Sequence, residues 1–159
     1  MSSFTQAQPK LLHPGGNDYF VDQFFEYYTS ILGFYMTIQV PEGFYTDLMS
    51  GPDALKKEVG IDREWCAAAS IVHDRLYYHP IAYRMNLPGM VQVRLSRKQC
   101  DLIYKEAITV LVPLFESSID EREVIHNIYK ILRNWGWFAW YKHRIREFLF
   151  GTISPGSTP

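Results

Sequence analysis

The stretch DREWCAAASIVHDRLYYHP, residues 62–80, decides how this chain is interpreted, because its apolar residues recur at helical spacing. Asp62 is a suitable N-cap, and Pro80 ends the pattern. We therefore expect a helix across this stretch, with one apolar stripe facing a core. The stripe comprises Trp65, Ala69, Val72 and Leu76.

A second face of the same helix carries side chains that could do chemistry. His73 in a mostly apolar helix calls for a group that orients its ring, and Asp101, early in the next predicted helix, is the candidate. If the two helices pack antiparallel, His73 can donate one ring N–H to Asp101 and keep the other nitrogen as a general base. A buried His–Asp pair that only ties two helices together is the alternative interpretation. The face comprises Cys66, Ser70, His73 and Tyr77.

The C-terminal half predicts three further helices. Ser96 and Gln99 match a capping box at the start of the first, whose apolar stripe begins at Cys100. A second capping signal, Asp120 with Glu123, opens the next helix, which ends at Trp135 before Gly136. The last helix follows and ends at the C-cap Gly151. These helices cover residues 96–114, 120–135 and 137–150.

The first third of the domain favours strands. Residues 19–21, 24–28 and 34–40 are rich in aromatic and β-branched residues, with Gly33 suited to a turn and Pro41 ending the last run. We expect an α+β fold: a small N-terminal antiparallel sheet followed by four α-helices in a single domain. Its predicted parts are a flexible tail over 1–17, one globular domain over 18–151 and a flexible tail over 152–159. The insert between Pro80 and Val93 is interpreted either as a hairpin covering the histidine or as a subunit contact.

Composition excludes several classes of protein. The chain has 159 residues, 47% hydrophobic and 16% aromatic, which excludes intrinsic disorder. Its formal charge of −1 argues against nucleic-acid binding, and two cysteines cannot form a disulfide framework. We expect no transmembrane segment and no signal peptide, and therefore a protein made in the cytoplasm of its host.

The loop that follows the predicted strands gathers small oxygen-bearing side chains. Gly43, Thr46 and Ser50 would support a turn in which Asp47, together with Asp74 from the helix, binds a divalent cation. Calcium is the first choice, because all of these donors are hard oxygen ligands. Helix caps and Asx turns are the alternative interpretation of the same residues.

Three strings in this order resemble a known family. VPEGFYTDLMS at 40–50, HDRLY at 73–77 and CDLIYKEA at 100–107 resemble the phage and prophage proteins classed as domain of unknown function 1353 (DUF1353). The resemblance covers roughly residues 35–110. It implies a bacteriophage protein, late-expressed or associated with the virion or tail, whose partners are other phage structural proteins, and it supplies no established activity.

The pattern HD-x-x-Y followed by a later Asp is also similar to the phospholipase A2 plan. That likeness implies His73 as the base, Asp74 as a calcium ligand, Asp101 as the orienting group and Tyr77 as a supporting hydroxyl. The disulfides and the Gly-rich calcium loop of those enzymes are missing from this sequence, the latter at 43–51.

The last predicted helix is aromatic and basic. Phe138, Tyr141, Ile145, Phe148 and Leu149 share an apolar face. Such a helix can close the domain core, dock on a protein partner through Trp137, Trp140 and Arg144, or lie in a membrane interface.

Two classes of function fit these observations. The first is a phage assembly protein that binds other phage proteins, in which the His/Asp cluster is architectural or holds a structural cation. The second is a metal-dependent hydrolase that attacks an ester or amide of the cell envelope, either lipid or peptide.

Overall fold

The computed structural model describes residues 2–15, 18–48, 66–86, 89–115 and 121–151. Predictions that concern Asp62, Trp65, Ser50 and Asp120, or the C-terminal tail over 152–159, lie outside these residues.

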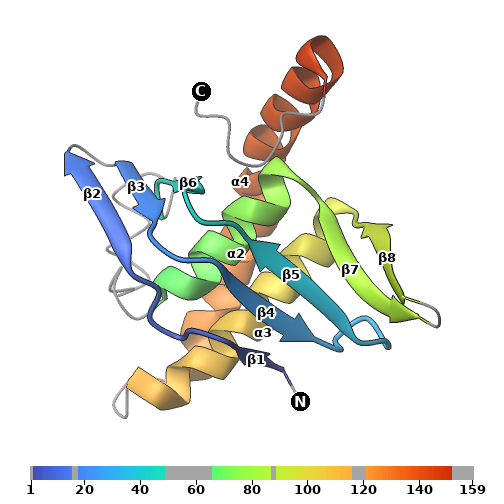
Figure 1. Cartoon of the computed structure of the whole chain (residues 1–159). Helices are drawn as coiled ribbons and strands as arrows, with labels where there is room; N and C mark the ends of the chain where they lie inside the picture. Colours follow the sequence, from blue (N-terminus) through green and yellow to red (C-terminus); the bar gives the residue numbers. More distant parts are fainter. Residues whose placement is uncertain (1, 16–17, 49–65, 87–88, 116–120, 152–159) are drawn as a thin grey trace.

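A five-stranded antiparallel sheet forms one layer of the fold (Figure 1). Its strand order is β1-β4-β5-β7-β8, and Gly33, at φ 86°, makes the turn between β4 and β5. At the centre of the sheet Tyr27 pairs with Ile38, and both side chains are fully buried. The strands are β1 (Ser3–Phe4), β4 (Phe25–Thr29), β5 (Met36–Val40), β7 (Ile81–Asn86) and β8 (Gly89–Arg94).

A smaller sheet in the order β2-β3-β6 lies beside the first. Val21 accepts a hydrogen bond from the amide of Gly43, whose φ of 74° suits a glycine, and its own amide donates to the Phe44 carbonyl. Phe44 and Leu48 are buried, so the apolar loop packs onto the domain. The strands are β2 (Leu11–Gly15), β3 (Asp18–Val21) and β6 (Tyr45–Thr46).

The structure differs from the tail expected over residues 1–17. Within that range β1 pairs with β4 and β2 pairs with β3. Phe4 packs on Tyr27 with ring centroids 4.5 Å apart, and the Ser2 hydroxyl donates to Glu106 over 2.7 Å. Pairing on an existing strand edge orders a segment that has no periodic pattern of its own.

The structure describes three helices, which pack against one another: α2 (Ala67–Tyr78), α3 (Arg97–Phe115) and α4 (Glu121–Phe150). Helix α2 contacts β5, α3 and α4, and ten of its twelve residues are buried. The capping box that opens α3 is present, because the Ser96 amide donates to Gln99 and the Gln99 amide to Ser96. The fold class is therefore α+β, as expected.

The two helices expected on either side of Gly136 are one continuous helix, α4. A Cβ atom at Gly136 would lie 2.5 Å from the hydroxyl oxygen of Tyr77. Gly136 thus permits α4 to approach α2 closely and does not end a helix.

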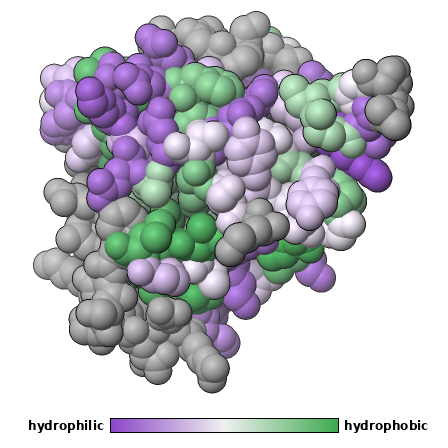
Figure 2. Space-filling model, turned by 60° about the horizontal axis from the view of Figure 1, so that its bottom comes forward, coloured by the Kyte–Doolittle hydropathy of each residue, from purple (hydrophilic) through white to green (hydrophobic). Residues whose placement is uncertain are grey.

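The insert after Pro80 is a hairpin, β7–β8, which extends the main sheet beyond β5. None of the described helices is long and apolar enough to cross a membrane. The face drawn in Figure 2 mixes hydrophilic areas with a hydrophobic patch, as expected for a domain whose large apolar side chains are not all buried.

Candidate functional site

A buried carboxylate, Asp101, is the centre of the candidate site. It lies near the start of α3, where the capping box fixes the first turn, and it is fully buried against α2 and α4. A buried ionised carboxylate is costly unless several donors satisfy it.

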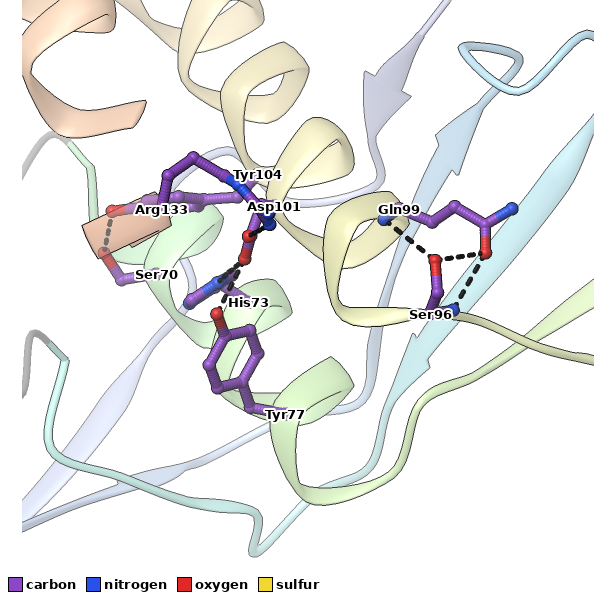
Figure 3. A network of polar contacts seen from close by, with 8 residues as sticks. All are labelled: Ser70, His73, Tyr77, Ser96, Gln99, Asp101, Tyr104 and Arg133. Atoms are coloured by element: carbon purple, nitrogen blue, oxygen red, sulfur yellow. Dashed lines mark hydrogen bonds and ion pairs between the residues drawn. The ribbon is translucent and has the colours of Figure 1, made fainter. Parts of the chain in front are cut away.

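Three side chains from two helices surround the Asp101 carboxylate (Figure 3). The Tyr77 hydroxyl donates to Oδ1 over 2.7 Å, and Nη1 of Arg133 donates to Oδ2 over 2.7 Å. Nε2 of His73 lies 3.5 Å from Oδ1. Because His73 and Tyr77 come from α2 and Arg133 from α4, the cluster joins all three described helices.

These donors keep Asp101 ionised. Burial alone raises the pKa of Asp101, but the hydrogen bonds from His73 and Tyr77, the nearby imidazole and the Arg133 guanidinium outweigh it, so the pKa is lowered. An ionised Asp101 favours the tautomer of His73 that carries its proton on Nε2. The lone pair of His73 is then on Nδ1.

Aromatic rings hold His73 from both sides. Its ring centroid lies 4.1 Å from that of Tyr77 and 4.5 Å from that of Tyr104. The Tyr104 hydroxyl is 3.3 Å from Ser70 Oγ. Ser70, His73 and Tyr77, on the polar face predicted for α2, therefore all contact side chains of α3. The side chain of His73 keeps 9% exposure, and its ring is held in one orientation without being sealed.

Asp74 points away from this cluster toward the loop after β6. Its Oδ2 accepts a hydrogen bond from the Thr46 hydroxyl over 2.5 Å. Thr46 Oγ1 in turn accepts the amide of Leu48, which adopts a left-handed φ of 59°. Burial, and then the negative charge of Asp47, raise the pKa of Asp74 to about 8 against the opposing effect of the Thr46 hydrogen bond.

The donor set around Asp74 consists of oxygens, which is the type that a hard cation prefers. Asp47 and Thr46 approach it as the sequence predicts, and Gly43 makes the preceding turn. Within the described part of the chain, no group of three or more His, Cys, Asp or Glu side chains is placed to hold a metal ion.

Two of the three residues expected to meet a partner face the domain interior. Trp140 packs edge-on against Tyr77 with centroids 5.4 Å apart. Arg144 Nη2 donates to the Tyr77 and Tyr78 carbonyls over 2.9 and 2.6 Å, which stabilises the C-terminus of α2. Trp137 is half-exposed.

Sequence reasoning missed Arg133 and Tyr104. Arg133 shares a face of α4 with Gly136, Trp140 and Arg144, at spacings of three, seven and eleven residues. That spacing was a usable signal, but only for a continuous helix, and the predicted break at Gly136 concealed it.

The fold and this cluster define an α+β domain with a His–Asp–Tyr–Arg cluster around a buried carboxylate at a junction of three helices. The model of the family described as "Protein of unknown function (DUF1353)" matches residues 20–134, and the chain belongs to this family. The expected resemblance to this family is confirmed, whereas the similarity to phospholipase A2 stays a prediction. All four residues of the cluster lie in the matched range. No curated protein and no solved structure matches the chain.

Proposed function

We propose that this protein is a hydrolase of phage or prophage origin, in which His73 is a general base oriented by Asp101. The observation that carries the proposal is the state of Asp101: fully buried, ionised, and held by Tyr77 and Arg133 with one oxygen toward His73. Phage origin, with late expression or association with the virion or tail, rests on the resemblance of the motifs.

Each residue of the cluster has a distinct part in this proposal. Nδ1 of His73 accepts a proton from an attacking water, and Asp101 stabilises the imidazolium that forms. Tyr77 and Arg133 are positioning residues, because they bond Asp101 and do not reach the reacting atoms. The tyrosine rings beside His73 restrict its rotation, which keeps the base aligned.

A divalent cation, calcium first, would be held by Asp74 and Asp47 with support from Thr46. When bound, it would polarise the carbonyl of an ester or amide in an envelope lipid or peptide. The proximity of two carboxylates supports this part of the proposal. Burial, and then repulsion by Asp47, raise the pKa of Asp74, and a cation between the two carboxylates would relieve that repulsion.

The test measures hydrolysis by purified protein in Ca²⁺ and in EDTA, with a chromogenic short-chain ester and phosphatidylglycerol vesicles as substrates. We expect turnover that needs Ca²⁺ and falls roughly 10²–10⁴-fold in His73→Ala. His126→Ala is the matched control, because His126 is exposed and lies about two turns before Arg133 on α4. Equal rates in both variants, or no turnover of either substrate, would contradict the proposal.

A second candidate is an assembly protein that binds other phage structural proteins, with an architectural cluster. It is favoured by one observation: the cluster ties α2, α3 and α4 together while His73 is largely buried. In this case His73→Ala lowers the free energy of unfolding by about 1–3 kcal/mol and no catalytic rate is lost.

A further inference from the structure

The outward face of the last turns of α4 is apolar although it is exposed. Phe148 is 88% exposed and Phe138 67%. We call this face the outer stripe of α4. It comprises Trp137, Phe138, Tyr141, Ile145, Phe148 and Leu149.

The outer stripe is continuous along the helix. At 100° per residue its six side chains fall within about 120° of the circumference, over about three turns. The same end of α4 extends beyond α2 and α3 in Figure 1. A contiguous exposed apolar surface on a rigid element marks a site of interaction.

The adjoining face of this segment, toward the domain, is already engaged. Trp140 packs on Tyr77, and Arg144 bonds the carbonyls at the end of α2. Glu147 pairs with Arg94 of β8 and with Arg144, both over 3.0 Å. These contacts fix the orientation of the helix, so the outer stripe remains directed away from the domain.

The charges beside the outer stripe are positive. Lys142 and Arg146 lie next to Leu149 around the helix, about 20° and 60° beyond it. Glu147 is the one acidic residue of the segment 137–150, and it is already paired. His143 adds no charge near neutral pH, because burial and the cations Arg144, Lys142 and Arg146 lower its pKa to about 4.

This charge pattern decides between occupants. A second copy packed antiparallel on the same stripe, about a twofold axis perpendicular to α4, would bring Lys142 and Arg146 against the same cations of its partner. The two cations lie at the edge of the stripe and not within it. From the edge, their charged groups can remain in water while the aromatic and aliphatic side chains of the stripe are buried. This arrangement is typical of helices that lie in the interface of an anionic bilayer.

We propose that the outer stripe of α4 binds the surface of an anionic lipid bilayer, with the apolar side chains in the interface and Lys142 and Arg146 at the headgroups. The proposal does not depend on hydrolysis, because none of its residues belongs to the Asp101 cluster. It places the protein on a membrane surface without spanning it.

The test is co-sedimentation with vesicles of phosphatidylcholine alone and of phosphatidylcholine with phosphatidylglycerol. We expect strong binding to the anionic vesicles only, weakened by salt, with a blue shift of tryptophan emission from Trp137. Ile145→Ser with Phe148→Ser should weaken binding more than tenfold. Met85→Ser is the matched control, because Met85 is 68% exposed on β7, and it should bind as the wild type does.

A second variant tests the charges separately. Lys142→Gln with Arg146→Gln should weaken binding to anionic vesicles about 25-fold, at about fivefold per cation. It keeps the proposal testable if the Ile145/Phe148 variant fails to fold, which circular dichroism would reveal.

Two results would overturn the proposal. One is a wild-type protein that sediments with neither kind of vesicle. The other is a dimer in light scattering that Ile145→Ser with Phe148→Ser dissociates while vesicle binding is absent in both proteins, which would assign the outer stripe to a second copy.

Discussion

Asp101 is the partner of His73 and Asp74 follows His73 in the chain, and the two carboxylates have opposite pKa shifts. Asp101 is fully buried and has a lowered pKa, whereas Asp74 is partly buried and has a pKa raised to about 8. The difference lies in their neighbours: Asp101 faces an arginine, a tyrosine hydroxyl and an imidazole, and Asp74 faces one hydroxyl and another carboxylate. Burial alone does not set the charge of an acid here, because the donors around it decide.

The same substitution at the two acids should therefore have different effects. Asp101→Asn removes the buried carboxylate that accepts from Tyr77 and Arg133 and should lower the free energy of unfolding by about 1–3 kcal/mol in urea denaturation. Asp74→Asn at pH 8 in EDTA should be neutral or stabilising, because it removes an unfavourable negative charge. An equal loss of free energy of unfolding in the two variants would contradict the proposed difference between Asp101 and Asp74.

The pH dependence of stability should distinguish the two acids by sign. A pKa raised to about 8 in the folded state, against about 3.9 in the unfolded chain, means that folded Asp74 binds more protons between these values. Its contribution to stability therefore falls by a few kcal/mol as pH rises from about 4 to 8. Asp101, with a lowered pKa, loses its contribution only as pH falls below its unfolded value.

Urea denaturation at pH 5 and pH 8 in EDTA measures this effect, with Asp74→Asn as the reference. Relative to that variant, the wild type should be less stable at pH 8 than at pH 5. A difference that stays constant would show that Asp74 is ionised throughout.

Gly136→Ala tests how the Asp101 cluster depends on helix packing. Alanine favours a helix interior by about 1 kcal/mol over glycine, but its Cβ would lie 2.5 Å from the Tyr77 hydroxyl and displace it from Asp101. We expect a net loss of about 1–2 kcal/mol. In Tyr77→Phe, which has no hydroxyl, the added effect of Gly136→Ala should be smaller, and a double-mutant cycle measures this coupling. A stabilised Gly136→Ala would contradict the close approach.

Of these substitutions, Thr46→Val, beside Asp74, should change the free energy of unfolding least. It removes the hydroxyl that donates to Asp74 and accepts the Leu48 amide, for a loss of about 0.5–1.5 kcal/mol. Thr109→Val is the control, because the Thr109 hydroxyl bonds only the Lys105 carbonyl on an exposed part of α3. Thermal or urea unfolding should rank Thr46→Val as the more destabilised of the two.

Local patterns in the sequence predicted the parts of the site that depend on local structure. Helical spacing placed His73 and Tyr77 on one face of α2, and the capping box positioned Asp101 at the start of α3. The structure places these side chains together, whereas their catalytic role remains a prediction.

The parts that were missed depend on contacts between distant segments. Arg133 enters the cluster because α4 approaches α2 closely at Gly136. From sequence alone, a glycine in a helical pattern is interpreted as a helix end, because the side chain that packs against it is not known. Strand β1 has two residues and is ordered by the edge of β4, which no property of its own sequence reveals.

The strand order of the main sheet has a consequence for how quickly the chain can fold. Strands β4 and β5 form one local hairpin and β7 and β8 form another, but the pair Met36–Arg84 joins them across the whole segment that contains α2. Closing a loop of that length costs chain entropy before the contact offers any gain, which slows folding. The pairing of β5 with β7 should therefore be late and rate-limiting, and substitutions within it should change the refolding rate more than substitutions within either hairpin.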